Sequence, residues 1–287
     1  VAALGTPPDK ALSPGYAEVE LLREQAAAIS WEKAGAEPPE LPRKAINAEQ
    51  RAILEALHEL RVLSAGQIQR EFLVSAGERQ VRRELSLLVR RRMIRRGELG
   101  LRKARGRGKR FYVLEEEGFA LLRDAADHPA SGTWRAPELH SSQHVVHDLA
   151  RNEWLWAFRS LAPRQLAGWR GPRSGKIEVP LVKEGRGPAR LLAPRDLREN
   201  SPIDAAGEEF ANLVPDLTLE LVLRRPSGES VETDLLVEIE WGNNDETVRR
   251  KAIAYDAFLT GWWRAHPRYR DLGRPPIVFF VVSDPRR

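Results

Sequence analysis

Three carboxylates in the C-terminal half have residue types and a spacing suited to metal-dependent hydrolysis. Asp216 heads one predicted strand, and Glu238 and Glu240 end the next. Strand residues two apart face the same side, so Glu238 and Glu240 are expected to project together. Their oxygens suit Mg²⁺ or Mn²⁺, which could activate water and stabilise a phosphodiester transition state. The residues expected to face the core instead are Leu235, Val237 and Ile239.

Basic residues are concentrated in one window of the chain. Fourteen of the 46 Lys and Arg residues lie between Arg79 and Arg110, where the only acids are Glu84 and Glu98. The window carries a net charge of +12 and the whole chain +5, so the remainder sums to −7. A cationic block on an otherwise acidic chain predicts a polyanion-binding surface. The alternative is a solvated charged face, which usually mixes both signs.

The elements around this window resemble a winged helix-turn-helix. Asn47 and Ser64 are predicted to start two helices, the second with Gln67 at capping-box spacing. A third helix, about 76–92, combines an apolar stripe with basic residues spaced by four, three and four, which suits a major groove. A hairpin with a Gly- and Arg-rich loop and a closing helix follow. The alternative is a three-helix bundle with a flexible tail.

Double-stranded DNA is therefore the expected partner of this segment. The third helix would meet the major groove, and the hairpin would neutralise the flanking phosphates. The predicted DNA-binding residues are Arg79, Arg82, Arg83, Ser86, Arg90, Arg102, Lys103, Arg105, Arg107, Lys109 and Arg110.

The second half of the chain alternates helix and strand patterns. A breaker-rich linker is expected at 128–139, followed by a helix over about 141–160. The predicted strands are Lys176–Val182, Asp216–Arg224, Thr233–Trp241 and Ile277–Val282, with a helix from Asp245 to about Arg264 before the last of them.

This order of one helix, three strands, a helix and a strand resembles the PD-(D/E)XK nuclease core. The resemblance implies catalytic roles for Asp216 and Glu238, but that motif has lysine where Glu240 stands. Lys251 or Arg250 on the following helix could supply the missing cation, as in nucleases whose lysine has moved to a helix. Glu153 is a candidate fourth carboxylate. The predicted catalytic residues are Asp216, Glu238, Glu240 and Lys251, and the predicted metal ligands of an active enzyme are Glu153, Asp216 and Glu238.

The chain from about Asn47 to Val282 resembles the replication-relaxation family of plasmids and phages. The resemblance is carried by the Arg-rich helix and hairpin, by His147-Asp148-Leu149-Ala150, by Pro215-Asp216, and by LLVEIEWGNNDET before a basic helix. It implies a winged helix-turn-helix fused to a nuclease-like domain, and DNA transactions such as plasmid replication or mobilisation. The segment 183–212 and the N-terminal arm have no counterpart in this resemblance.

The sequence as a whole predicts an α+β protein of 287 residues: an N-terminal arm or helix over 1–45, with a helix at Tyr16–Trp31, a winged helix-turn-helix over 46–127, the linker, and a restriction-endonuclease-like αβββαβ domain over 140–287. It contains no Cys and no apolar run long enough for a membrane span, and it lacks a secretory signal pattern. A cytoplasmic protein is expected.

Two function classes remain open from the sequence. In the first, the protein is a DNA-binding factor without enzyme activity, with a degenerate nuclease-like domain that serves as a homodimer or protein-partner contact. In the second, it is an endonuclease or nickase dependent on Mg²⁺ or Mn²⁺ and directed by the winged domain. Glu240 favours the first class. A third reading is that the three carboxylates are ordinary solvent-facing residues of a half-exposed sheet.

Overall fold

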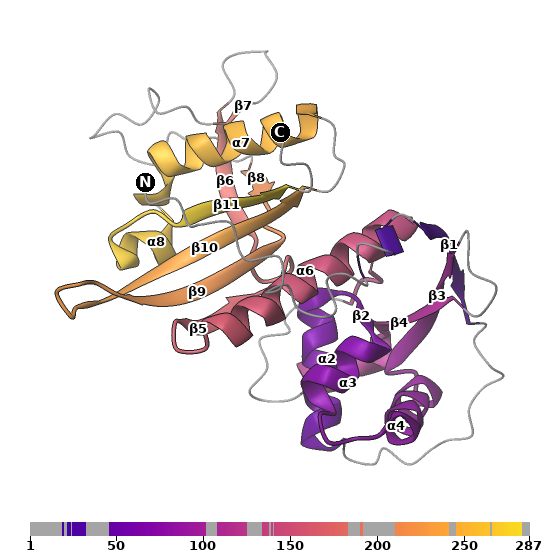
Figure 1. Cartoon of the computed structure of the whole chain (residues 1–287). Coiled ribbons are helices and arrows are strands. Elements are labelled where there is room, and N and C mark those ends of the chain that lie inside the picture. The colour runs from indigo at the N-terminus through magenta and orange to yellow at the C-terminus, as the bar shows by residue number, and fades with distance from the viewer. Residues whose placement is uncertain are drawn as a thin grey trace. The chain divides into compact units, whose positions relative to one another are not determined.

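The protein divides into two compact units, Val1–Ala157 and Phe158–Arg287 (Figure 1). The computed structural model describes residues 19, 22–23, 25–32, 46–101, 108–124, 134–137, 139, 141–182, 190–191, 210–240, 245–264 and 266–282. Helices and sheets occur in both units, which confirms the α+β class expected from the sequence. Among these residues no helix is long and apolar enough to cross a bilayer.

The elements of the first unit follow one another closely. They are β1 (Ala26–Trp31), α2 (Ala48–Leu60), β2 (Leu63–Ser64), α3 (Ala65–Phe72), α4 (Glu78–Arg90), β3 (Ile94–Leu101), β4 (Lys109–Leu114) and α5 (Glu116–Arg123). Helix α6 (Ser142–Leu161) begins in this unit and ends in the second. Both predicted helix starts are confirmed, because Asn47 and Ser64 each form a capping box with the residue three positions on.

A four-stranded sheet in the order β1-β3-β4-β2 supports the helices of this unit. Strands β3 and β4 form an antiparallel hairpin, and β1 pairs antiparallel with the outer side of β3. The helix predicted over Tyr16–Trp31 is therefore wrong from Ala26 onward. Trp31 packs edge-on against Phe111 of β4, at 5.3 Å between ring centroids, so distant pairing overrides the local helical pattern.

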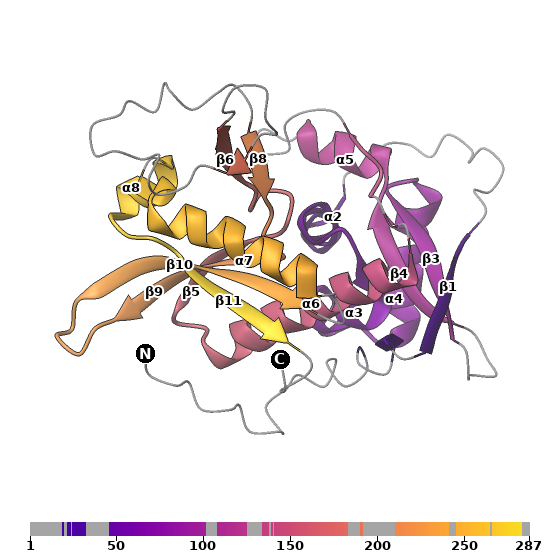
Figure 2. The ribbon, with the colours of Figure 1, turned by 90° about the horizontal axis from the view of Figure 1, so that it is seen from above.

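The second unit is built on a sheet in the order β11-β10-β9-β5. Strands β5 (Leu166–Arg170), β9 (Leu217–Arg224) and β10 (Ser230–Glu240) pair antiparallel, and β11 (Ile277–Val282) lies parallel to β10. Between β10 and β11 the chain forms α7 (Asp245–Thr260), the 3₁₀ helix η3 (Trp262–Arg264) and α8 (Pro267–Leu272). The helix predicted over Asp245–Arg264 thus ends four residues early. Helix α7 covers one face of this sheet (Figure 2).

The first strand of this sheet is not the one the sequence indicated. The segment predicted as Lys176–Val182 forms β6 (Ile177–Val182), which pairs with β7 (Arg190–Leu191) and β8 (Phe210–Leu213) in a separate small sheet. The short strand β5 instead takes the place beside β9. The strand predicted at Lys176–Val182 is therefore confirmed as β6, but its expected place as the first strand of the main sheet is wrong; the other three predicted strands are confirmed and lie in that sheet.

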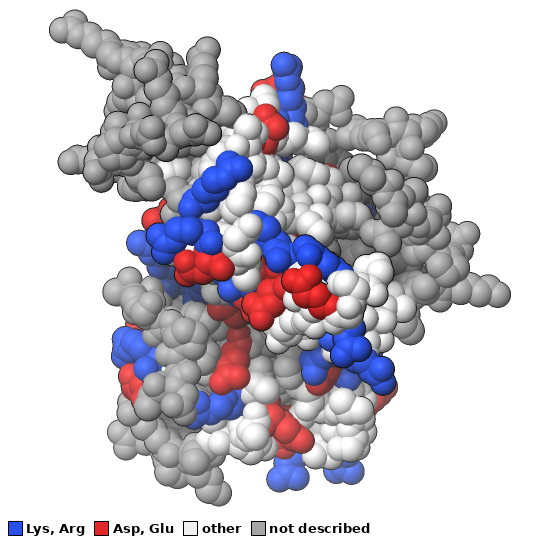
Figure 3. Space-filling model, turned by 90° about the vertical axis from the view of Figure 1, so that its left-hand side faces the viewer, with Lys and Arg blue, Asp and Glu red and all other residues white. Residues whose placement is uncertain are grey.

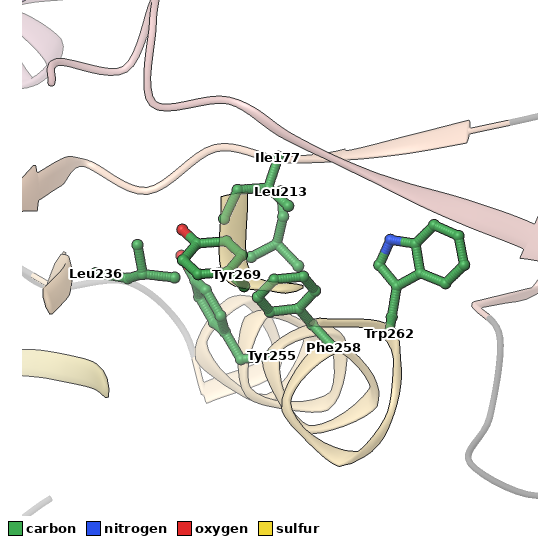
Figure 4. Packing of buried hydrophobic residues seen from close by; sticks show 7 residues of the cluster. All are labelled: Ile177, Leu213, Leu236, Tyr255, Phe258, Trp262 and Tyr269. Carbon is green, nitrogen blue, oxygen red and sulfur yellow. The ribbon is translucent and has the colours of Figure 1, made fainter. Parts of the chain in front are cut away.

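A buried aromatic cluster joins α7 to the sheet (Figure 4). Phe258 of α7 is fully buried and packs edge-on against Tyr269 of α8, at 5.5 Å between ring centroids. Leu236 of β10 lies in the same cluster, so the face of β10 that carries Leu236 is a core face. The cluster consists of Ile177, Leu213, Leu236, Tyr255, Phe258, Trp262 and Tyr269.

Candidate functional site

Helix α4 has one apolar face and one basic face. Its buried residues are Val81, Leu85 and Leu88. At 100° per residue the opposite side of the helix is centred on the stripe spaced by four, three and four. All members of this stripe are exposed: Arg79, Arg83, Ser86 and Arg90. The structure therefore presents a row of cations to solvent, as the spacing predicts.

Most of this row is not neutralised by the residues that the structure describes. Arg82, at the margin of the face, pairs with Glu78 one turn earlier at 3.0 Å, and both side chains are largely exposed. Arg79, Arg83 and Arg90 form no ion pair with any residue that the structure describes. An exposed pair such as Arg82–Glu78 contributes little to stability and exchanges readily for another anion.

Where the structure describes them, the predicted basic residues of the hairpin after α4 are less exposed than the row on α4. Arg102, Lys103, Arg105 and Arg107 lie outside the described residues. Lys109 and Arg110, at the start of β4, are half-buried. Burial lowers the pKa of Lys109, and the negative charge of Glu153 partly opposes this effect. Lys109 therefore has an internal electrostatic partner in the first unit.

Some arginines of the basic window are matched by the protein's own groups. Arg95 pairs with Glu115 at 2.9 Å and stacks over the ring of Trp31, with 4.0 Å from its Cζ to the ring centroid. Arg96 pairs with Glu32 at 2.7 Å. The stacking on Trp31 and the pairing with Glu32 could not be read from the sequence, because these two residues lie in the unpredicted strand β1 or directly after it.

One exposed cation of this region was not predicted. Arg92 lies in the turn between α4 and β3, is exposed, and has a positive φ of 54°. The run Arg90-Arg91-Arg92 was its only signal in the sequence.

Opposite charges are intermixed on one face of the protein. In the face shown in Figure 3, Lys and Arg side chains lie beside Asp and Glu side chains, and no continuous surface of one sign appears among the described residues. The row on α4 differs from this mixed pattern in carrying cations alone along its centre.

Helix α6 joins the first unit through buried ionised groups. Asp148 is fully buried and pairs with Arg61 and Arg151, each at 2.8 Å. Burial by itself would raise the pKa of Asp148, but Arg151, His147 and Arg61 outweigh it and lower the pKa. Arg151 also donates to the carbonyl of Leu60. The first turns of α6 are thus bound to the rest of the first unit by buried ion pairs and hydrogen bonds.

Glu153, five residues after Asp148 on α6, is likewise held by hydrogen bonds from the first unit. Its Oε1 accepts hydrogen bonds from Gln67 Nε2 at 2.9 Å and Arg70 Nη2 at 2.8 Å, and its side chain is buried. The sequence suggested Glu153 as a metal ligand with Asp216 and Glu238. In the structure its carboxylate has these partners in the first unit instead, and binding a metal would require their displacement.

The carboxylates of the second unit are gathered beneath α7. Glu238 and Glu240 lie on the same side of β10, as predicted, but both are buried instead of facing solvent. Lys251 Nζ donates to Glu238 Oε2 at 2.7 Å and to Glu240 Oε1 at 2.6 Å. Asp216, just before β9, accepts from the backbone N–H of Ile239 at 2.8 Å. These side chains form the carboxylate cluster: Asp216, Glu238, Glu240 and Lys251.

The choice between the two cations of α7 is resolved by the geometry. Lys251 is half-buried against the carboxylates, whereas Arg250 is exposed. Tyr255, one turn after Lys251, donates its hydroxyl to Glu238 Oε1 at 2.5 Å. Lys251 and Tyr255 therefore hold Glu238 from the same side of the helix.

The cluster changes the protonation of its members. Burial raises the pKa of Glu238 to about 7; the charge of Asp216 adds to the rise, and Lys251 opposes it. The pKa of Lys251 lies above its ordinary value, because Asp216 and Glu238 outweigh the effect of burial. Burial and the neighbouring Glu238 raise the pKa of Tyr255. At neutral pH the cluster therefore contains an ammonium, a neutral phenol and a partly protonated Glu238.

This arrangement does not fit a bound metal ion. Among the described residues, no three His, Asp or Glu side chains are grouped as metal ligands. The donor chemistry suits Mg²⁺, but one oxygen of each of the three carboxylates accepts a hydrogen bond from the protein, from Lys251 or from a backbone N–H.

Comparison with known proteins identifies the family of most of the chain. No curated protein and no solved structure matches it. A family model described as replication-relaxation matches residues 54–269, which includes both α4 and the carboxylate cluster. The protein belongs to the replication-relaxation family.

Proposed function

We propose that this protein binds double-stranded DNA through the exposed face of α4 and the adjoining β3–β4 hairpin. Its role would be in the replication or mobilisation of plasmid or other mobile-element DNA, or in the regulation of these processes, in keeping with its family. The observation that carries the proposal is the row of exposed arginines on α4, opposite a fully apolar face. Guanidinium groups along one helix can contact both phosphates and guanine edges in a major groove.

The order of elements supports a winged helix-turn-helix reading. Helices α2, α3 and α4 precede the β3–β4 hairpin, and α3 and α4 are joined by the five residues 73–77. In such a motif the last helix enters the major groove, and the hairpin lies over the flanking backbone. The basic residues assigned to the hairpin loop remain part of this proposal: Arg102, Lys103, Arg105 and Arg107.

The second unit supports the reading of a degenerate nuclease-like domain. Its three antiparallel strands, the crossover helix α7 and the parallel strand β11 follow the order expected for a PD-(D/E)XK core. Lys251 approaches Glu238 from α7, as a displaced lysine would. The burial of Glu238 and Glu240 and their shared ammonium favour a structural role. The domain would then serve in dimerisation or partner contact.

DNA binding is tested by fluorescence anisotropy with a labelled duplex at several salt concentrations. Replacing Arg79, Arg83 and Arg90 together by Ala should weaken binding at least tenfold and reduce the salt slope by about one unit for each phosphate that is no longer neutralised. The matched control replaces Arg159, Arg164 and Arg224 together by Ala, which removes three exposed cations from the second unit. Binding that is independent of salt, or equally weakened by the control, contradicts the proposal.

An endonuclease is the second candidate function, because Lys251 and Glu238 lie together. Supercoiled plasmid incubated with the protein and Mg²⁺ or Mn²⁺ would report nicking. Intact plasmid is the expected result. Nicking by the native protein that Asp216→Ala and Glu238→Ala both abolish would establish the enzyme instead.

A further inference from the structure

We propose that Lys251 is the resident cation of the carboxylate cluster: its ammonium takes the position between Glu238 and Glu240 that a divalent metal would occupy, so the native cluster binds no metal. This inference concerns the second unit alone and does not depend on DNA binding by α4.

The position of the ammonium is defined by two short contacts. Lys251 Nζ lies 2.7 Å from Glu238 Oε2 and 2.6 Å from Glu240 Oε1, distances typical of charge-assisted hydrogen bonds. Both carboxylate side chains are 2% exposed, so the ammonium and not a hydration shell compensates their charge. A metal bridging Glu238 and Glu240 would need these same oxygens at about 2.0 to 2.6 Å. It would therefore have to expel Lys251, because two cations cannot share that position.

The other contacts of the cluster already occupy carboxylate oxygens that a metal would use as ligands. Glu238 Oε1 accepts the Tyr255 hydroxyl, and Asp216 Oδ2 accepts the Ile239 backbone N–H. A metal would have to compete with these donors as well as with the ammonium. A buried carboxylate with hydrogen-bonded partners is already compensated for the loss of water.

Another buried carboxylate on β10 is also paired with cationic side chains. Asp234, six residues before Glu240 and on the same side of the strand, is 1% exposed. It accepts two hydrogen bonds from Arg268 at 2.6 and 2.7 Å and one from Arg170 at 3.0 Å. The buried carboxylates on this face of β10 are thus each held by a cationic side chain of the same unit. Lys251 completes that pattern at the end of the strand.

The first test is a Mn²⁺ titration of the full chain, followed by electron paramagnetic resonance. Native protein should leave all Mn²⁺ free at stoichiometric concentrations. One equivalent of bound Mn²⁺ that Glu238→Gln removes would overturn the proposal.

The second test replaces Lys251 by methionine, an uncharged side chain of similar length. Lys251→Met should lower the melting temperature by about 10 °C, because it leaves two buried carboxylates without their cation. Millimolar Mn²⁺ should recover part of that decrease by occupying the vacated position. The matched control Arg250→Met removes the neighbouring exposed charge and should stay within about 2 °C of native protein. A Lys251→Met midpoint equal to the control, or one indifferent to Mn²⁺, contradicts the proposal.

A third variant covers failure of Lys251→Met to fold. The double variant Glu238→Gln, Lys251→Met removes one carboxylate charge together with the ammonium. It should fold and melt above Lys251→Met, because fewer buried charges lack a partner. A double variant that is no more stable than Lys251→Met would show that Lys251 does not act through its charge.

Discussion

Arg61 donates hydrogen bonds to the buried carboxylate of Asp148, and the backbone of Arg61 has a conformation that favours glycine. Its Nε and Nη2 donate to Asp148 at 2.8 to 3.0 Å, and its φ is 64° at the end of α2. A side chain at such a φ is strained, so the ion pair and the backbone oppose each other at one residue. Arginine at this position supplies an ionic partner to the fully buried Asp148.

Two substitutions of Arg61 separate the loss of the ion pair from the relief of backbone strain. Arg61→Ala should lower the free energy of unfolding by about 2 to 3 kcal/mol, because Asp148 keeps only Arg151 as an ionic partner at a similar distance. Arg61→Gly removes the same ion pair but relieves the backbone, so it should be about 1 kcal/mol more stable than Arg61→Ala. Urea unfolding of both variants measures the difference. A glycine variant less stable than the alanine variant would contradict the strain at this residue.

The stability of the protein should depend on pH through Glu238. Burial raises the pKa of Glu238 to about 7 from its ordinary value of 4.5. The folded state therefore holds a proton that the unfolded state has released, and the free energy of unfolding contributed by Glu238 falls as pH rises from about 4.5 to about 7. This decrease is at most about 3 to 4 kcal/mol, from about 1.4 kcal/mol for each pKa unit.

Glu238→Gln provides the comparison for that pH effect. Glutamine cannot ionise, and its amide oxygen can still accept the Tyr255 hydroxyl. The difference between native and variant stability, from urea unfolding at a series of pH values, should change across about pH 4.5 to 7 and be constant above it. A difference independent of pH would show that Glu238 titrates normally.

The charge pattern of α4 predicts a variant that binds DNA more tightly. Glu78 pairs with Arg82 at 3.0 Å at the margin of the basic face. In the proposed binding mode, Glu78→Gln removes an acid next to the phosphate contacts and releases Arg82, so DNA affinity should rise about threefold at low salt and less at high salt. Glu49→Gln is the matched control, since Glu49 is an exposed acid in the first turn of α2. Equal gains from both variants would assign the effect to net charge alone.

The base of the hairpin tolerates no side chain at Gly97. A Cβ there would overlap the ring of Phe111, which is fully buried and cannot move aside. Gly97→Ala should therefore cost about 1 to 3 kcal/mol of stability. Gly100→Ala, in the same strand, meets its nearest atom, the Ala28 carbonyl oxygen, at 3.7 Å and should change stability by less than about 0.5 kcal/mol. Thermal unfolding compares the two, and equal costs would contradict the close packing at Gly97.

Features encoded by neighbouring residues were predictable from the sequence. The capping boxes at Asn47 and Ser64 depend on residues three positions apart, and the basic row of α4 follows from helical spacing alone. Alternation along β10 likewise placed Glu238 and Glu240 on one side. In each case the helix or strand itself fixes the relative positions.

Features that depend on distant partners were not predictable in the same way. Ala26–Trp31 has a helical apolar pattern but becomes a strand through pairing with β3. The five-residue strand β5 was overlooked because β6 has the stronger strand pattern. Burial of Glu238 could have been suspected from Leu236, which shares its side of β10. The choice of Lys251 over Arg250 required the rotation of α7, for which Tyr255 and Phe258 were the available signal.

The course of α6 has a practical consequence for dividing the protein. Sixteen of its residues, Ser142–Ala157, lie in the first unit, and the helix continues to Leu161 in the second. A fragment that stops at residue 127 would lack Asp148 and Glu153, the carboxylates that pair with Arg61 and Arg70, together with the apolar side of α6. A fragment that extends through Leu161 keeps these groups and ends where the helix itself ends, so the first unit is best prepared with α6 attached.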